Sequence, residues 1–382
     1  MRVGWLERDL TFLSFVIHDE MIRMKTSPVS SRIEGLSQAW PRPSKPRPIV
    51  LIGAGGIAND AHLPAYRKAK FEVGGVFDVD PEKARATAKK FGIPRVFQSL
   101  EEAAATRPAV FDVAVPPEHI LGILQILPDG AAALIQKPMG RNLEEARRIL
   151  GLCREKKLVA AVNFQLRFSS MMLSIRDLVQ RGVLGEVTDV EVRLNLMTPW
   201  EIFPFLKKLD RVEILVHSIH YLDWIRSLLG NPKGVYARTL PDVRYPELKN
   251  TRSSIILNYG DTARCCLSIN HHYAHGGRHQ AAMIKVEGVR GAAFGKLGVM
   301  MNYPKGEPDE LEIVTGPDHS TFASLEGGWF PDAFIGTMSS LQRVATGEDA
   351  LLPTRVEDAF QTMALVEACF QSSAQGGTPI PS

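Results

Sequence analysis

Cysteine is scarce in this 382-residue sequence, which contains only Cys153, Cys265, Cys266 and Cys369. None of the four has the spacing of a metal-ligand motif. Cys265 and Cys266 are neighbours in a strand-like run, so we expect their side chains on opposite faces of a sheet. These features favour free thiols in a reducing compartment, and we expect a cytoplasmic protein.

Long apolar runs are missing as well, because no stretch approaches the roughly 18–20 residues that a membrane-spanning helix needs. The short apolar run at 10–17 contains Thr11 and Ser14 and leads to no small-residue cleavage site. We therefore expect neither a membrane span nor a secretory signal.

No excess of charge of one sign is present either. The net charge is +3, and basic and acidic residues are interspersed along the chain. This balance argues against a nucleic-acid partner and against a polybasic membrane-binding surface. Hydrophobic residues make up 45% and charged residues 23%, as in ordinary globular proteins. The length allows two domains, each with its own core.

Residues 1–47 differ from the rest of the chain. Residues 5–24 could form an amphipathic helix, whereas residues 41–48 contain four prolines in eight positions. Such a proline-rich segment cannot be helical and is typical of an extended linker. We therefore expect 1–47 to be a poorly ordered or loosely docked extension, and Met21 or Met24 offers an alternative start.

A glycine-rich turn at 49–58 is the most informative stretch. Four apolar residues run directly into glycines, which is the pattern of a buried strand that opens into a loop and a helix over 57–68. Gly53 allows a tight turn, Gly55 lets a pyrophosphate approach the backbone, and Ala58 lets the helix pack on the strand. The first helical N–H groups would point at the phosphates. The expected dinucleotide contacts are Gly53, Gly55, Gly56, Ile57 and Ala58.

An acidic residue follows at the right distance. A second strand, 71–77, ends at Asp78, which lies 22 residues after Gly56. A carboxylate about 20 residues after the glycines can hydrogen-bond a ribose 2′-hydroxyl. It would repel a 2′-phosphate, so NAD is favoured over NADP. Alternatively, Asp78 only begins a turn and caps the next helix.

The order of elements predicts the fold class. From Pro48 to Phe164 strands and helices alternate, which predicts a doubly wound parallel sheet, a Rossmann domain, over 48–166. Beyond it, adjacent strand-like runs predict an α+β domain over 167–382 with a large, mostly antiparallel open sheet and closing C-terminal helices. Ligands of such parallel sheets bind at the carboxyl ends of the strands. Residues expected there, beside the glycine-rich turn, are Val115, Pro116, Gln136 and Lys137.

Three ionisable residues are candidates for chemistry. Lys137 follows a buried strand, where desolvation would lower its pKa and suit it to proton transfer, unless it is a solvated loop lysine. A helix predicted over 211–229 places Glu213, His217 and His220 on one stripe. The two histidines could equally be structural.

A histidine-rich run at 270–279 contains four histidines but no supporting carboxylate or cysteine spacing. We expect no metal site there. A substrate contact, a subunit interface or a solvated loop are the alternatives. Trp200 and nearby aromatic residues could line a sugar site or simply belong to the core.

Several motifs occur together in the order of a known family. They are 53–58, 115–117, Lys137-Pro138, 163–168 and 219–223. On these motifs the chain, over about residues 48–380, resembles the Gfo/Idh/MocA (glucose–fructose oxidoreductase / inositol dehydrogenase / rhizopine catabolism) family. The resemblance implies an N-terminal Rossmann domain that binds NAD(P). It also implies a C-terminal domain that holds a sugar or cyclitol on an open sheet, whose outer face often forms a dimer or tetramer contact.

The resemblance assigns roles and exposes two departures. Lys137 looks like the lysine of the family's Glu-Lys-Pro motif, and His220 looks like its second-domain catalytic histidine. Gln136 replaces the glutamate before the lysine, and Val216 stands where many members have aspartate, four residues before His220. His217 or Glu213 could take over the role of that acid; the alternative is a weak or different activity.

The resemblance thus implies an NAD-dependent oxidoreductase acting on a secondary alcohol of a sugar, sugar acid or cyclitol. Lys137 with His220 would accept the hydroxyl proton while hydride passes to nicotinamide C4. Alternatives are redox-neutral, NAD-dependent glycoside cleavage or epimerisation, and a non-enzymatic metabolite sensor on the same fold. The expected substrate contacts are Arg167, Trp200, His217 and His271.

Overall fold

The computed structural model of the chain describes residues 33–202, 204–302 and 305–381. The amphipathic helix expected at 5–24 lies outside these residues. Within them, no helix is both long and apolar enough to cross a membrane. The four cysteines are free thiols, and Cys265 is buried while Cys266 is partly exposed, as expected for neighbours on opposite faces.

The first sheet confirms the predicted doubly wound domain. Its five strands lie in the order β2-β1-β3-β4-β5, and all neighbouring strands are parallel. β1, β3 and β4 are buried along their whole length, which explains why their sequences are continuous apolar runs. The strands are β1 Ile49–Ile52, β2 Val73–Phe77, β3 Val110–Val113, β4 Ala132–Ile135 and β5 Val159–Val162.

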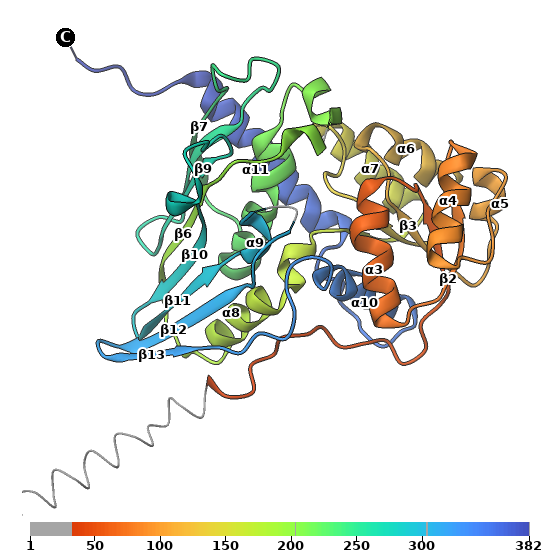
Figure 1. Cartoon of the computed structure of the whole chain (residues 1–382), viewed down its shortest axis with the longest axis horizontal. Helices are drawn as coiled ribbons and strands as arrows, with labels where there is room; N and C mark the ends of the chain where they lie inside the picture. Colours follow the sequence, from red (N-terminus) through yellow and green to blue (C-terminus); the bar gives the residue numbers. More distant parts are fainter. Residues whose placement is uncertain (1–32, 203, 303–304, 382) are drawn as a thin grey trace, which may run out of the picture.

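Helices connect these strands and cover both faces of the sheet (Figure 1). The first begins as a π-helical turn, Ala58–His62, and continues as α3, Leu63–Ala69. The others are α4 Pro81–Phe91, α5 Leu100–Ala104, α6 Pro117–Ile126 and α7 Leu143–Glu155.

The second sheet has eight described strands, in the order β13-β12-β11-β10-β6-β9-β8-β7. Every neighbouring pair is antiparallel except β6 and β9, so the prediction of a mostly antiparallel sheet is confirmed. The strands are β6 Val187–Asn195, β7 Gly234–Leu240, β8 Arg252–Asn258, β9 Arg264–Asn270, β10 Ala281–Gly288, β11 Gly291–Lys296, β12 Glu310–Gly316 and β13 His319–Phe322.

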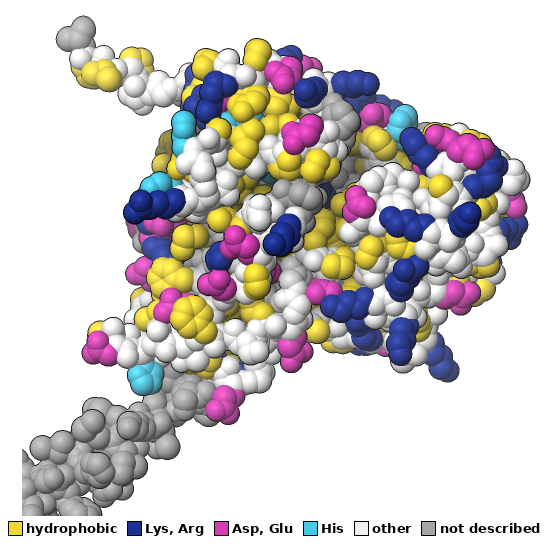
Figure 2. All heavy atoms as spheres, viewed as in Figure 1, with side chains coloured by type: hydrophobic (Ala, Val, Ile, Leu, Met, Phe, Trp, Pro, Cys, Tyr) yellow, Lys and Arg dark blue, Asp and Glu magenta, His cyan; other side chains and the backbone are white. Residues whose placement is uncertain are grey.

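One face of this sheet is covered by helices and the other is open (Figure 1). The covering helices are α8 Ser170–Gln180, α9 Ile219–Leu229 and α11 Val356–Gln375. Acidic and basic side chains both occur across the face of the molecule seen in Figure 2. This agrees with the interspersed charges of the sequence.

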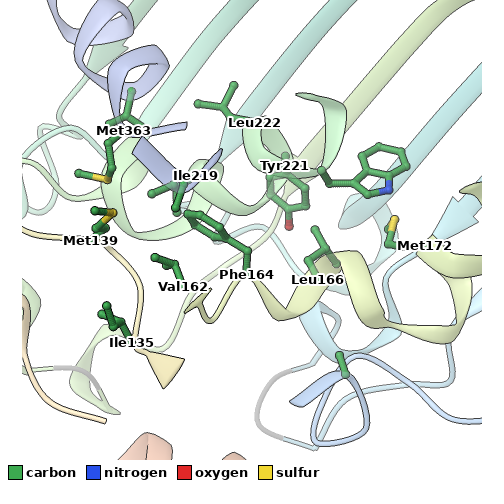
Figure 3. Close-up of a cluster of buried hydrophobic side chains, with 14 of the residues drawn as sticks. Ile135, Met139, Val162, Phe164, Leu166, Met172, Ile219, Tyr221, Leu222 and Met363 are labelled. Atoms are coloured by element: carbon green, nitrogen blue, oxygen red, sulfur yellow. The ribbon is translucent and has the colours of Figure 1, made fainter. Parts of the chain in front are cut away.

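A continuous apolar core joins the two domains. Ile135 and Val162, at the ends of β4 and β5, belong to the same buried cluster as Ile219 and Leu222 of α9. Figure 3 shows Phe164 between these strand ends and the helix. The carboxyl ends of the parallel strands are therefore held against α9, the helix that carries His220.

The chain also returns from the second domain to the first. α10, Ala333–Ala345, packs on the parallel sheet through Phe334, Ile335, Met338 and Leu341. The sequence predicted a closing helix here but not that it completes the core of the first domain.

The described part of the N-terminal extension, from residue 33 to residue 47, contacts the rest of the protein. The indole of Trp40 lies 5.1 Å from the ring of Phe168. The side-chain amide of Gln342 on α10 bonds both the N–H and the carbonyl of Arg47, at 2.9 and 2.8 Å. Side-chain partners, which the proline pattern does not reveal, fix this extended segment.

A buried ion-pair cluster lies at the junction of the domains. Arg167 bonds Asp223 of α9 through two nitrogens and Asp358 of α11 at 2.6 Å. Arg226 also reaches Asp358, at 3.2 Å. The side chain of Asp223 is fully buried and that of Arg167 is 10% exposed. The expectation that Arg167 contacts substrate is corrected, because its guanidinium is committed to carboxylates of the protein.

Arg167→Met should lower the free energy of unfolding by about 3–5 kcal/mol, because it leaves Asp223 buried without its cation. Urea denaturation would measure the loss. Arg85→Met, which removes an exposed ion pair with Glu82, should leave the midpoint unchanged. Equal midpoints for the two variants would contradict a structural role for Arg167.

Candidate active site

The glycine-rich turn has the geometry that the sequence predicts. Gly53 has φ +102°, and a Cβ there would lie 2.4 Å from the carbonyl oxygen of Ala114. Only glycine fits where the turn after β1 approaches the backbone after β3 so closely. A Cβ on Gly55 would meet no atom within 4 Å, so the space above this residue is open. Gly55 and Gly56 are exposed, whereas Ala58 is buried where the helix packs on the strand.

Asp78 holds this turn from the end of β2. One carboxylate oxygen accepts the N–H of Ala54 at 2.7 Å, and the other accepts the N–H of Asp80 at 2.8 Å. The helix cap is Asp80, whose side chain accepts the N–H of Glu82 at 3.0 Å. The alternative that Asp78 caps the helix is therefore wrong, although it does begin the turn.

Asn59 was missed by the sequence analysis. Its side-chain amide donates to the carbonyls of Ala54 and Gly55, at 3.0 and 3.1 Å, and to the hydroxyl of Thr87 at 3.0 Å. Asn59 thus braces the turn from inside the helix. An asparagine in a helix gives no signal of this role unless its partners are known.

These features fit a dinucleotide. The space above Gly55 can admit a pyrophosphate, and the first N–H groups of the helix, at Gly56 and Ile57, have no acceptor within the helix. The Asp78 carboxylate stands at the neighbouring strand end, and each of its oxygens keeps a lone pair for a ribose hydroxyl. Val115 and exposed Pro116 lie at the end of β3, beside the same turn.

Lys137 follows β4 and is largely buried. Its Nζ donates to the backbone carbonyl of Val216 at 2.9 Å. Burial lowers the pKa of this lysine to about 8. The alternative of a solvated loop lysine is excluded, and the lysine can lose and regain a proton near neutral pH.

His217 and His220 lie close to the lysine. Burial lowers the pKa of both well below the ordinary value, and the charge of Lys137 adds to the effect at each. Both imidazoles are therefore neutral at pH 7. Nδ1 of each ring has no hydrogen-bond partner. The rings can therefore still donate to or accept from a ligand.

The predicted stripe of three residues is interrupted. Residues Ile214–Ser218 form a π-helical turn before α9, so the expected continuous helix over 211–229 is corrected. Glu213 is fully buried, accepts the Ser218 hydroxyl at 2.5 Å and lies 3.8 Å from His271 Nε2. Its carboxylate therefore faces Ser218 of the π-helical turn and His271, the residue that follows β9.

Trp200 and His271 belong to the same cluster. The indole lies 5.7 Å from the rings of both His217 and His271, and these two imidazoles are 4.6 Å apart. Thr198 bonds His271 Nδ1 at 2.7 Å. The structure thus brings together Lys137, His217, His220, Trp200 and His271. Among the described residues no group of three His, Cys, Asp or Glu side chains is arranged to hold a metal ion.

A pair of glycine substitutions tests the dinucleotide site. Gly55→Ala should leave the thermal midpoint nearly unchanged but weaken NAD binding at least tenfold, because its methyl group enters the open space above the turn. Gly53→Ala should instead cost roughly 1–3 kcal/mol of stability, because of its φ and the Ala114 carbonyl. Calorimetric titration and thermal melts separate the two effects. Unchanged NAD affinity in Gly55→Ala would contradict this placement.

Comparison with known proteins agrees with this geometry. A sequence model of an oxidoreductase family with an NAD-binding Rossmann fold matches residues 47–164. The model of the family's C-terminal alpha/beta domain matches residues 176–381.

Two relatives illustrate the extent of the similarity. D-glucoside 3-dehydrogenase of Escherichia coli (strain K12) is 29% identical over 195 residues, which are 50% of this chain and 56% of the relative. D-apiose dehydrogenase of Rhizobium rhizogenes is 23% identical over 350 residues, which are 86% of this chain and 95% of the relative. The chain therefore spans little more than half of the first relative and nearly all of the second.

Solved structures share the fold. An oxidoreductase from Agrobacterium radiobacter, in complex with NAD+, L-tartaric acid and magnesium, aligns with a TM-score of 0.72 at 21% identity, covering 87% of this chain and 98% of that chain. The WlbA dehydrogenase from Bordetella pertussis, in complex with NADH and UDP-GlcNAcA, aligns with a TM-score of 0.67 at 21% identity, covering 88% and 100%. Since the two sequence models match most of its length, the chain belongs to the Gfo/Idh/MocA oxidoreductase family, whose N-terminal domain is an NAD-binding Rossmann fold.

Proposed function

We propose that the protein is an NAD-dependent dehydrogenase that oxidises a secondary alcohol of a sugar, sugar acid or cyclitol. The observation that carries the proposal is Lys137, a largely buried lysine with its pKa lowered to about 8. It lies where the parallel sheet meets the histidine cluster. Residues that would hold NAD are Gly53, Gly55, Gly56, Ile57, Ala58, Asp78, Val115 and Pro116.

Lys137 is suited to accept the hydroxyl proton of the substrate. In its neutral form the amine has a lone pair, and the Val216 carbonyl fixes one of its N–H groups at 2.9 Å. Neutral His220 lies beside it and can donate to or accept from the same hydroxyl. Bound NAD would supply the acceptor for the hydride that leaves the substrate carbon.

The remaining residues of the cluster favour an uncharged, hydroxyl-bearing ligand. Trp200 presents an indole N–H without a partner, and His217 and His271 each keep one ring nitrogen free of hydrogen bonds. The two relatives named for D-glucoside and D-apiose oxidation act on sugars. We infer that Trp200, His217 and His271 contact the substrate.

We also propose that the active form is a homo-oligomer that associates through the open face of the eight-stranded sheet. Large apolar side chains are exposed on these strands, including Tyr236, Ile256 and Met283 at 65%, 51% and 45%.

The burial that raises the pKa of Cys153, Cys265 and Cys369 to about 12 keeps these thiols unreactive. The proposed compartment is the cytoplasm.

The decisive experiment follows NADH absorbance with NAD and a panel of sugars, sugar acids and inositols, with NADP in parallel. One substrate should give NADH, with NAD preferred over NADP. Lys137→Met should lower kcat/KM at least about 100-fold while still binding NAD. Lys90→Met, an exposed lysine of the same domain, should be unchanged.

A silent panel with intact NAD binding would overturn net dehydrogenation. It would favour the redox-neutral reaction or the sensor, and these two differ in their need for Lys137. A redox-neutral enzyme should lose turnover in Lys137→Met. A sensor should bind its sugar equally well in that variant.

The pH dependence follows from the lowered pKa of Lys137. Only the neutral amine accepts a proton, so kcat/KM for oxidation should rise about tenfold per pH unit below about pH 8 and level off above it. Initial rates measured from roughly pH 5.5 to about pH 10 would show the midpoint of the kcat/KM profile. A profile that falls as pH rises through 8 would contradict Lys137 as the base.

A further inference from the structure

A buried polar network adjoins Gln136, the residue before Lys137, and the proposed chemistry does not use it. His62 Nδ1 lies 2.8 Å from Asp112 Oδ2, and the Tyr66 hydroxyl donates to the same oxygen at 2.8 Å. All three residues are 0% exposed. His62 ends the π-helical turn that follows the glycine-rich turn, while Asp112 is in β3. The network therefore spans the cofactor helix and the centre of the parallel sheet.

The Asp112 carboxylate sets the tautomer of His62. It can only accept, so the imidazole carries its proton on Nδ1 and leaves Nε2 as an acceptor. Two side-chain amides face that atom, Asn163 Nδ2 at 3.3 Å and Gln136 Nε2 at 3.5 Å. Both are donors, so they match a neutral His62.

Gln136 connects this imidazole to the lysine. Its Nε2 faces His62, and its Oε1 accepts the backbone N–H of Lys137 at 2.9 Å. A carboxylate has no proton to donate and could face His62 Nε2 only if the imidazole took up a second proton. An amide at position 136 is thus the group that suits a neutral His62 and the lysine backbone together.

The charges around the lysine are equally specific. The titratable groups near Lys137 are His217 and His220, both neutral. Those near His62 are Asp112 and Tyr66. One oxygen of the Asp112 carboxylate bonds both His62 Nδ1 and the Tyr66 hydroxyl. Glu213 approaches His271, at 3.8 Å. No carboxylate among the described residues forms an ion pair with Lys137, and burial alone lowers its pKa.

We propose that Gln136 is a positioning residue, which links the backbone of Lys137 to His62 of the His62–Asp112 pair and places no charge of its own beside the lysine. The proposal rests on the proposed function in one respect, that Lys137 is the base.

Gln136→Glu tests the charge. A carboxylate next to Lys137 stabilises the ammonium form, so the acidic limb of the kcat/KM profile should move up by about 1 pH unit or more. Gln136→Leu removes both hydrogen bonds without adding charge, so it should lower kcat and leave the limb in place. Gln125→Glu, on the exposed face of α6, adds the same charge elsewhere and should change neither.

The second measurement needs no substrate. Protein labelled with ¹⁵N in the histidine rings should show His62 as the neutral Nδ1–H tautomer at pH 7, with the signal assigned by its loss in His62→Asn. In Gln136→Leu the same tautomer should persist, because the Asp112 carboxylate sets it. Thermal melts would show that each variant is folded.

The outcomes separate the two proposals. A limb that does not move in folded Gln136→Glu would overturn the role of Gln136. A wild-type protein with no turnover on any substrate would overturn the dehydrogenase proposal. The tautomer of His62 would still be measured in that case, and an Nε2–H form would refute the coupling to Gln136.

Discussion

The close contact between the parallel sheet and α9 is the constraint on which the site depends. Lys137 follows β4, and His220 lies on α9, so neither domain alone contains both residues. The buried bonds of Arg167 to Asp223 and Asp358 and the apolar cluster around Phe164 lock this contact. Buried ion pairs gain little over apolar packing in stability but impose one geometry, which is what a two-domain site requires.

Burial also determines the chemistry of the cluster. Lysine and two histidines close together would repel one another if all were charged, but burial leaves both imidazoles neutral and brings the lysine near its titration point. The site therefore contains several groups that can exchange a proton and little fixed charge. Such a site is compatible with an uncharged alcohol as ligand.

The sequence predicted features that reside in contiguous segments. The turn at Gly53, the strand-end Asp78 and the site of Lys137 follow from local constraints on backbone and spacing. Features that depend on residues distant in the sequence could not be predicted. Arg167 is paired with Asp358, 191 residues away, and Gln342 bonds Arg47 across 295 residues. The π-helical turn before α9 was not predicted either, because the apolar spacing of this segment fits a regular α-helix.

The return of α10 to the parallel sheet has a consequence for how the chain is made. β5 ends at Val162, but the helix that covers β4 and β5 begins only at Ala333. A ribosome therefore exposes the nucleotide-binding strands long before Phe334 and Met338 can shield them. The core of the N-terminal domain is therefore completed only after α10 has been synthesised, later than in a domain formed from one continuous segment.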